Sequence, residues 1–256
     1  MVKDMPRLVA IHRYPVKGLS AESLERVEIA VAEGLPLDRV FALAHGSTRF
    51  DPDAPEWLEK SLFLMLMRNE RLAALETALD PATSVLTVKR ESKVVARGDL
   101  KTKIGRTTIE QFFAAYLKDQ VRGTPKVVAA PGHVFMDVPE KVATLINRAS
   151  VEDLRRVVGR AVDPMRFRAN FQIEDAPAWS EFEWVGRKLK IGGASFEVTG
   201  RIDRCAATNV EPGTGSRDMQ IPKALQTGYG HVEFGVYLRC VEAGALAQGD
   251  DVVVEN

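Results

Sequence analysis

The sequence predicts a mainly β protein with a few helices, in the α+β class. Short apolar stretches recur between Gly, Pro and Asp residues, and three of them fall within residues 1–45. Closely spaced short strands with turns between them are typical of a small barrel or sandwich. Strands and helices do not alternate regularly, which argues against a doubly wound parallel sheet.

The composition is ordinary for a globular protein and excludes several classes. Lys and Arg together number 35, as do Asp and Glu, so we expect no nucleic-acid partner. No apolar run is long enough to span a bilayer, and the first residues lack the apolar core of a signal peptide. Two cysteines, Cys205 and Cys240, do not make a disulfide framework. We therefore expect a cytoplasmic protein with no membrane partner.

Three strands are predicted in the first part of the chain. They cover residues 8–14, 24–31 and 40–44, and an exposed loop over residues 46–60 follows. Residues 24–31 alternate between apolar and polar side chains, as in a half-buried antiparallel strand. The turn after the first strand presents Lys17, and Asp38 and Arg39 directly precede the third strand.

The next segment contains one clear hairpin and one clear helix. Residues 62–79 fit either a helix or strands, whereas residues 85–96 read as a hairpin. Thr107 and Glu110 have the spacing of a capping box, and apolar residues repeat at helical intervals over residues 109–117. The chain changes character at the Gly-Thr-Pro sequence of residues 123–125, after the predicted helix and before the next predicted strand, which suggests a domain boundary there.

The second half predicts further strands and one more helix. The strands expected there cover residues 126–130, 195–199, 233–241 and 252–254. Residues 142–146 fit either strand or helix. Ser150 is a good helix start and Gly159 a good helix stop, and Trp179–Trp184 is expected to form a hairpin with residues 189–191 around Gly186.

The stretch Asp163–Ile173 suggests a binding face. If residues 166–173 form a strand, Arg166, Arg168 and Asn170 project to one side and apolar residues to the other. Guanidinium and amide groups in a row suit an anionic ligand, but the same pattern also fits a solvated sheet face with acidic partners.

The stretch Arg201–Gly215 contains the residue with the clearest chemical potential, Cys205. Arg201 and Arg204 flank it, and guanidinium charge favours the thiolate that attacks electrophiles and binds soft metals. A lone cysteine is also often a small buried side chain, which is our expectation for Cys240. If the strand continues, Arg201, Asp203 and Cys205 share a face and Arg204 opposes them.

Other familiar chemistries have no support in the sequence. There is no P-loop, no dinucleotide-binding glycine motif, no HExxH motif and no GxSxG motif. The four histidines lie far apart, without metal-ligand spacing.

Four motifs in order resemble those of the MOSC family, named for the C-terminal domain of molybdenum cofactor sulfurases. They are YPVK followed by GLPLDR, RFRAN, RCAATNVEPGTG, and FGVY followed by AGALAQGDDV. The resemblance is strongest to proteins of the amidoxime-reducing component type, which also have an N-terminal MOSC β-barrel domain. Gly18, Ala169 and Glu211 depart from the usual motif residues.

The resemblance implies a β-barrel domain over residues 1–124 and a MOSC β-barrel domain over residues 125–256, with a molybdenum–molybdopterin cofactor between them. It implies that Cys205 is the metal ligand, and that Asp203 either orients Arg204 or transfers protons. It implies that the cofactor is held by Lys17, Arg39, Arg168, Asn170 and Arg204. Ser150, Arg166 and Arg201 are weaker candidates near the site.

Three functions are compatible with these residues. The first is a reductase of N-hydroxylated compounds, which implies a small-molecule substrate. No haem or iron–sulfur site is recognisable in the chain, so we expect a separate electron-donor protein of the ferredoxin or cytochrome b5 type. The second is a sulfur carrier with a persulfide on Cys205. The third is a protein that stores or hands over the cofactor.

Overall fold

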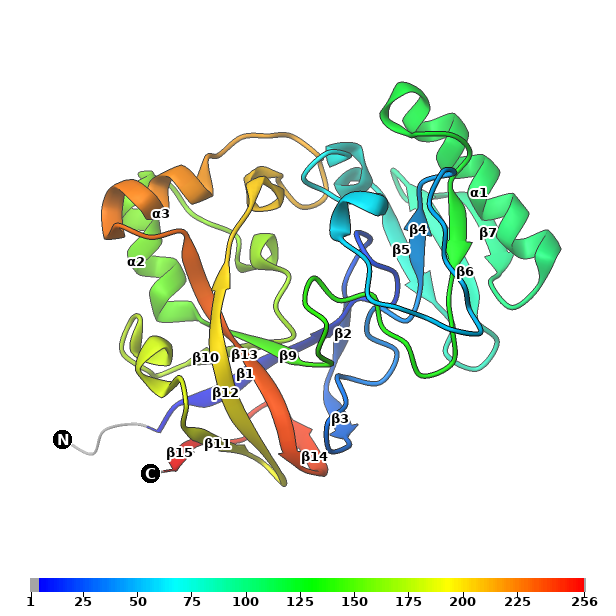
Figure 1. The fold of residues 1–256 in the computed structure, drawn as a ribbon. Helices are drawn as coiled ribbons and strands as arrows, with labels where there is room; N and C mark the ends of the chain where they lie inside the picture. Colours follow the sequence, from blue (N-terminus) through cyan, green and yellow to red (C-terminus); the bar gives the residue numbers. More distant parts are fainter. Residues whose placement is uncertain (1–4, 256) are drawn as a thin grey trace.

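The computed structural model describes residues 5–255, which form mostly strands with three α-helices, as the predicted α+β class requires (Figure 1). The strands are β1 (Arg7–Arg13), β2 (Glu22–Leu24), β3 (Arg26–Ile29), β4 (Ala42–Ala44), β5 (Glu76–Leu79), β6 (Val85–Arg90), β7 (Lys93–Asp99), β8 (Lys126–Val128), β9 (Ala143–Asn147), β10 (Phe171–Glu174), β11 (Lys188–Ile191), β12 (Ala194–Asp203), β13 (Glu233–Glu242), β14 (Gly244–Ala247) and β15 (Val252–Glu255). The α-helices are α1 (Lys103–Leu117), α2 (Arg148–Val158) and α3 (Ile221–Tyr229). The 3₁₀ helices are η1 (Lys60–Leu62), η2 (Glu70–Ala74), η3 (Lys118–Gln120), η4 (Pro164–Phe167), η5 (Ser180–Trp184) and η6 (Ala206–Asn209).

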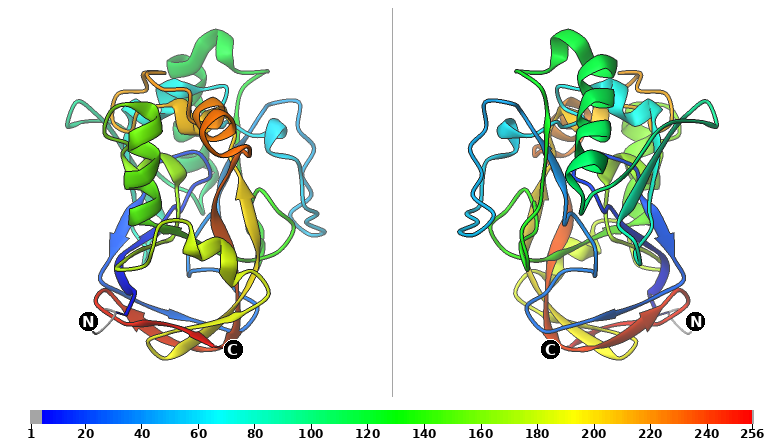
Figure 2. Two further views of the ribbon diagram at one scale, coloured as in Figure 1. Left: turned by 90° about the vertical axis from the view of Figure 1, so that its left-hand side faces the viewer. Right: turned by 90° about the vertical axis from the view of Figure 1, so that its right-hand side faces the viewer.

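Eight strands form one large sheet, in the order β15-β11-β12-β13-β9-β10-β1-β2. The pair β9 and β10 runs parallel, because α2 connects the two strands, and the other neighbours run antiparallel. The sheet curls into a half-barrel, which the lower part of each view in Figure 2 shows most clearly. Its strands supply the largest apolar core, which includes the fully buried side chains of Phe171, Phe196 and Val236.

The first strands of the chain belong to this large sheet. Leu8 of β1 pairs with Ile173 of β10, and β2 pairs with the other edge of β1. Strand β3 pairs with β14, with Ile29 opposite Gly244. Residues 7–29 therefore contribute to the body that is otherwise built from residues 143–255.

A second body contains the sheet β5-β6-β7, the pair β4–β8 and helix α1 (Figure 1). Its core includes Val88, Ile109 and Phe113. The predicted hairpin is formed by β6 and β7. Helix α1 starts earlier than predicted, because the side chain of Thr102 accepts a hydrogen bond from Gly105 N at 3.1 Å. The capping box assigned to Thr107 was therefore wrong.

Helix α2 begins earlier than predicted, because its N-cap is Asn147 and not Ser150. Asn147 caps it by accepting a hydrogen bond from Ala149 N at 2.9 Å, and Ser150 lies in the first turn. Gly159 ends the helix in the left-handed conformation, with φ of 81°, as predicted. Helix α3 packs against α2.

Two strand predictions were wrong. Over residues 164–167 the chain forms η4, because Pro164 suits the first helical position and Asp163 accepts a hydrogen bond from Met165 N. Arg168 then adopts a left-handed conformation with φ of 51°, so Arg166, Arg168 and Asn170 do not share a strand face. Residues 180–184 form η5, and β11 makes its hairpin with β12 instead.

Within residues 5–255, no helix combines the length and the apolar character needed to cross a bilayer.

Candidate active site

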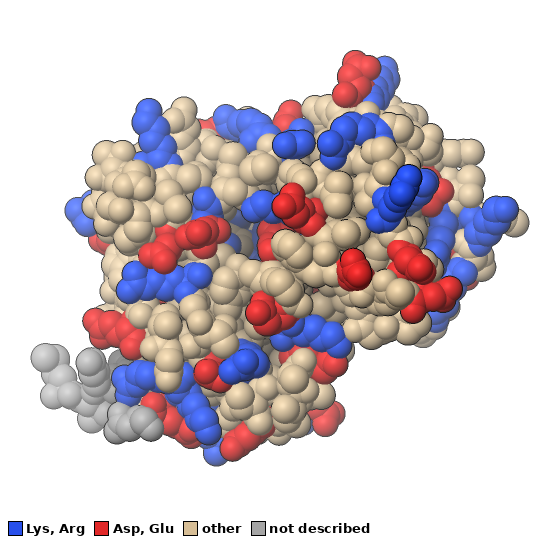
Figure 3. Space-filling view, in the orientation of Figure 1, with Lys and Arg blue, Asp and Glu red and all other residues tan. Residues whose placement is uncertain are grey.

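A cavity of about 290 Å³ lies where the two bodies meet, and Cys205 lines it. In Figure 3 this face of the molecule is hollowed between its two halves, with acidic and basic side chains at the margin. Six cationic side chains line the cavity, against two acidic ones, Asp137 and Asp203. The cations are Lys17, Arg39, Lys60, Arg166, Arg168 and Arg204. Such a set of converging cations suits an anionic ligand.

Cys205 lies directly after the long strand β12. The strand ends at Asp203, and Arg204 N donates to the carbonyl oxygen of Val232 at 2.9 Å. The carbonyl oxygen of Cys205 accepts from the backbone and the hydroxyl of Thr208, at 3.1 and 2.9 Å. These bonds fix the main chain, and the side chain is left partly exposed.

The end of β12 also changes the predicted distribution of side chains. Asp203, Arg204 and Cys205 all line the cavity, although the strand pattern placed Arg204 on the opposite face. Arg201 is not among the lining residues, and it forms an ion pair with Glu233 at 3.2 Å and lies over the ring of Phe182. The prediction that Arg201 shares a face with Cys205 was wrong, because extended structure stops at Asp203.

Arg204 is held with one nitrogen unpaired. Its Nε donates to the carbonyl oxygen of Phe234 and its Nη1 to that of Phe167, both at 2.8 Å. Its Nη2 is buried and has no hydrogen-bond partner among the described residues. Burial lowers the pKa of Arg204 to about 10. An unpaired buried donor is costly, so the site is suited to a ligand that supplies an acceptor.

Lys17 is buried and connects to the segment at residues 135–137. Its Nζ donates to the carbonyl oxygen of Phe135 at 2.9 Å and forms an ion pair with Asp137. Burial lowers the pKa of Lys17, and the nearby carboxylate offsets this only in part. Burial works against ionisation of Asp137 as well, but the attraction of Lys17 holds the pKa of that carboxyl below its ordinary value.

Arg39 and Arg168 are packed together in the same wall. Arg39 pairs with Asp38, and its Nη2 donates to the carbonyl oxygen of Arg168 at 3.1 Å. Arg168 Nη2 donates to the carbonyl oxygen of Leu19 at 2.8 Å. Burial lowers the pKa of Arg168 to about 10. Burial also works against the charge of Arg39, but Asp38 outweighs it and raises the pKa of Arg39.

Arg166, a weaker candidate, lines the cavity from η4. Its side chain is 2% exposed and forms an ion pair with Asp218 at 2.8 Å, and its Nε has no partner among the described residues. Asp218 also pairs with Arg160 on the other side.

Asn170 and Ser150 are not among the residues that line the cavity. Asn170 is fully buried; its Oδ1 accepts from Thr144, and its Nδ2 donates to the carbonyl oxygen of His12 at 3.0 Å. Ser150 donates to the buried carboxylate of Glu181 at 2.7 Å. Both side chains hold together elements of the body that is built on the eight-stranded sheet.

Several lining residues were not predicted. The most distinctive are the apolar side chains Met65, Met67 and Met136, together with Lys60 and Tyr237. Burial raises the pKa of the Tyr237 hydroxyl. The MLM run at residues 65–67 and the last residue of the FGVY motif were the available signals. The run was not assigned to the site, because residues 62–79 fit two structures equally well.

Two family models match this chain, one in its first half and one in its second half. The MOSC N-terminal beta barrel domain matches residues 5–126, and the MOSC domain matches residues 132–253. The fold and the site thus define a two-domain MOSC protein. The chain belongs to the MOSC family, as the motifs indicated.

Similar curated proteins carry the name molybdenum cofactor sulfurase. The one from Drosophila persimilis is 34% identical over 122 residues, which are 43% of this chain and 14% of that protein. Those from Caenorhabditis elegans and Danio rerio are 33% and 32% identical, over 37% and 40% of this chain. The match covers 14% of each of these two proteins as well, so it is confined to a small part of each relative.

Two solved structures are also similar. YuaD from Bacillus subtilis covers 98% of this chain and 96% of its own, with 11% identity and a TM-score of 0.46. YiiM from Geobacillus stearothermophilus covers 44% of this chain and 54% of its own, with 18% identity and a TM-score of 0.36.

The residues of the cavity fit a molybdenum–molybdopterin cofactor. Its phosphate requires cations and its metal accepts a soft thiolate, and this cavity offers both, together with the unpaired nitrogen of Arg204. Among residues 5–255 no group of three or more His, Cys, Asp or Glu side chains could hold a metal ion by itself.

Proposed function

We propose that this protein is a cytoplasmic, molybdenum-dependent oxidoreductase that reduces N-hydroxylated compounds such as amidoximes and hydroxylamines. One observation carries the proposal: the partly exposed Cys205 lies in a cavity with six cationic side chains. A soft thiolate beside a basic pocket suits a metal whose organic ligand is anionic. The names of the related sulfurases associate this family with the same cofactor.

In this proposal Cys205 binds the metal, and the basic wall holds the pterin and its phosphate. Arg168 and Arg204 are the main candidates for the phosphate, because both half-buried side chains line the cavity and Arg204 Nη2 has no partner among the described residues. Lys17 and Arg39 add charge to the same wall. Asn170 and Ser150 act through the elements that they hold in place.

The apolar part of the cavity lining would contact the substrate. Met65, Met67 and Met136 provide apolar contact area, which also keeps water from the reacting atoms. Asp203 lies next to Arg204 in the sequence and lines the same cavity, so its carboxyl is placed either to orient Arg204 or to take part in proton transfer. Tyr237 is a second hydroxyl group at the cavity.

The cofactor, when bound, supplies two-electron exchange. Reduction of an N–OH group to N–H consumes two electrons and two protons and releases water. The electrons come from a separate donor protein of the ferredoxin or cytochrome b5 class.

The direct test is metal and pterin analysis of protein freshly isolated from a molybdenum-replete host. We expect molybdenum and pterin in the wild type and in Cys240→Ala, which replaces the buried cysteine. We expect loss of molybdenum in Cys205→Ala. Wild-type protein without molybdenum, or full retention by Cys205→Ala, would contradict the proposal. Bound cofactor without turnover by any electron donor would point to storage or transfer of the cofactor.

A sulfur carrier is the second candidate, and the names of the related sulfurases favour it. In this reaction the Cys205 thiolate attacks the outer sulfur of a cysteine desulfurase persulfide, and the desulfurase thiolate leaves. Mass spectrometry after incubation with a desulfurase tests it. A reducible gain of one sulfur atom on Cys205, in protein without bound pterin, would support the carrier over the reductase.

A further inference from the structure

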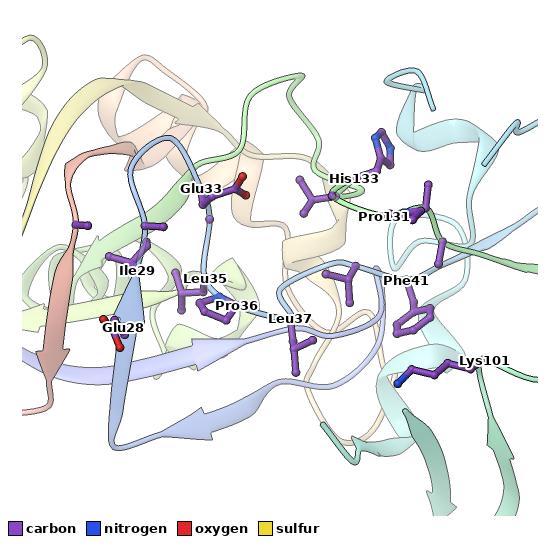
Figure 4. Close-up of a pocket in the computed structure, with 18 of the residues that line it drawn as sticks. Glu28, Ile29, Glu33, Leu35, Pro36, Leu37, Phe41, Lys101, Pro131 and His133 are labelled. Atoms are coloured by element: carbon purple, nitrogen blue, oxygen red, sulfur yellow. The ribbon is translucent and has the colours of Figure 1, made fainter. Parts of the chain in front are cut away.

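A second, larger cavity lies on the other side of two segments that form the Cys205 cavity. Its volume is about 870 Å³, which is within the range of pockets that bind small molecules. The lining residues come from β3, the segments at residues 33–41 and 129–134, and the start of α1. Figure 4 shows the side chains that converge on it.

The walls of this second cavity are mainly apolar. Ile29, Leu35 and Phe41 are nearly buried, at 1%, 3% and 9% exposure. Leu37 and Val134 are partly exposed and line the cavity too. Leu37 and Val134 still expose apolar surface, so a ligand with an extended apolar body gains affinity by covering them, while the buried side chains shape the wall.

One end of the cavity carries a cation that has no side-chain partner in the described part of the chain. Lys101 lies beside Phe41, and its amino end points toward Leu37 in Figure 4. Its side chain is exposed and makes no hydrogen bond or ion pair with residues 5–255. Arg106 lines the same cavity, and its Nε donates to the carbonyl oxygen of Leu100. This end is therefore positively charged.

The acidic side chains lie elsewhere around the cavity. Glu33 is already paired, since Lys141 Nζ lies 2.7 and 2.8 Å from its two carboxylate oxygens. Glu28 lies at the opposite end from Lys101 in Figure 4. His133 is neutral near pH 7, because burial lowers its pKa below the ordinary value of 6.5. Lys101 is thus a cation of this cavity whose side chain has no hydrogen-bond or ion-pair partner among residues 5–255, and the positive charge of Arg106 adds to it.

We propose that this cavity binds an amphipathic anion, with its carboxylate at Lys101 and its alkyl chain along Leu37, Leu35 and Ile29. A medium-chain fatty acid has this chemistry. The proposal does not depend on the function of the Cys205 site.

A ligand there would contact the back of the wall that carries the cations of the Cys205 cavity. Leu37 and Val40 line the second cavity, whereas Arg39 lines the first. Likewise, Val134 lines the second cavity and Asp137 lines the first. Phe135 N, between them in the sequence, donates to the carbonyl oxygen of Arg39 at 2.8 Å. The two cavities therefore share two chain segments that are hydrogen-bonded to each other.

The test is calorimetric titration of the full-length protein with decanoate, decan-1-ol and decylamine. We expect decanoate to bind most tightly, because only its head group complements Lys101. Lys101→Glu should weaken decanoate binding by about tenfold or more. It should leave decan-1-ol nearly unaffected, as should the control Lys93→Glu on β7. Absence of decanoate binding, tighter binding of decylamine, or unchanged affinity in Lys101→Glu would overturn the proposal.

A second pair of variants locates the ligand. Ala130→Trp fills the second cavity from a partly exposed position, and we expect it to abolish binding of both decanoate and decan-1-ol. Arg168→Gln removes a cation from the Cys205 cavity and should leave decanoate affinity unchanged. The reverse result, with loss in Arg168→Gln and none in Ala130→Trp, would place the ligand at Cys205 and refute the assignment.

Discussion

The ring of Tyr14 lies 4.3 Å from the guanidinium carbon of Arg168, and the guanidinium carbon of Arg39 lies 4.9 Å from the same ring. Tyr14 is 1% exposed, and its hydroxyl contacts the carbonyl oxygen of Ala169 at 3.4 Å. One aromatic side chain thus fixes two of the cations in the wall of the Cys205 cavity. Cation–π contacts in desolvated sites contribute about 2 kcal/mol each.

Tyr14→Leu should weaken retention of the proposed cofactor by about tenfold, because Arg39 and Arg168 lose the ring that positions them. Tyr14→Phe keeps the ring and should retain the cofactor within about twofold. Molybdenum and pterin content per mole of purified protein measures both. Equal loss in the two variants would show that the hydroxyl, and not the ring, is what matters.

Arg217 connects the segment after Cys205 to residues 66–67, which line the same cavity. Its Nη2 donates to the carbonyl oxygens of Leu66 and Met67, at 3.3 and 2.7 Å, and Nη1 donates to that of Ala206 at 3.3 Å. Arg217→Ala should lower the free energy of unfolding by roughly 2 kcal/mol. It should also speed alkylation of Cys205 by iodoacetamide, since the wall beside the thiol loosens.

Arg239→Ala is the matched control for Arg217, because Arg239 makes only an exposed ion pair with Glu197. It should change the free energy of unfolding by less than about 1 kcal/mol. Chemical denaturation and the rate of alkylation are the two measurements. If Arg217→Ala alkylates no faster than Arg239→Ala, the wall does not depend on this contact.

Gly235, in the FGVY motif, has no room for a side chain. Its φ is +74°, and a Cβ there would lie 2.4 Å from the carbonyl oxygen of Leu145 and 3.3 Å from Arg204 Nη2. Gly235→Ala should therefore cost about 3 kcal/mol or more and should displace Arg204. Gly213 has a similar φ of +82° but open space around it, so Gly213→Ala should cost only about 1 kcal/mol. Thermal unfolding measures the stability of the two variants. Equal destabilisation would show that the positive φ alone accounts for the cost, and that the steric contacts at Gly235 add nothing.

Glu181 should make stability depend on pH. Its carboxylate is fully buried, and burial raises its pKa from 4.5 to about 7. The folded state then binds the proton more tightly than the unfolded state. The free energy of unfolding should therefore fall as pH rises from about 4.5 to about 7, by roughly 3 kcal/mol, and this contribution should level off above pH 7.

Urea denaturation at pH 5 and pH 8 tests the role of Glu181. Glu181→Gln should remove most of the difference between the two pH values. Glu183→Gln, at an exposed position of the same 3₁₀ turn, should leave it in place. A Glu181→Gln variant with the full wild-type difference would assign the pH dependence to other groups.

Local signals predicted the elements whose structure depends on neighbouring residues. The β6–β7 hairpin and the end of α2 at Gly159 follow from alternation and from a left-handed glycine. The strand predicted around Arg166 was wrong, because the alternation of side chains is typical of a strand whereas Asp163 and Pro164 start a 3₁₀ helix. The alternation favours a strand and the capping residues favour a 3₁₀ helix, and the structure follows the capping residues.

The site itself depends on contacts between segments far apart in the sequence. The motif resemblance indicated Lys17, Arg39, Arg168, Arg204 and Cys205, and the fold brings all five to one cavity. Asp137 and the three methionines have no motif. Their positions depend on how residues 65–67 and 135–137 pack against the body that contains the eight-stranded sheet. No periodicity within those two segments predicts that packing.

Strand β1 has a consequence for the order of folding during synthesis. Leu8 pairs with Ile173, and Leu8 N also bonds to the carbonyl oxygen of Asp250. Strand β1 therefore lacks the partner on one of its edges until β10 (Phe171–Glu174) has been made. Sheets closed by such distant partners form slowly, and the exposed edge of a waiting strand invites association with other chains. Until then, the free edge of β1 is a surface on which another chain could pair.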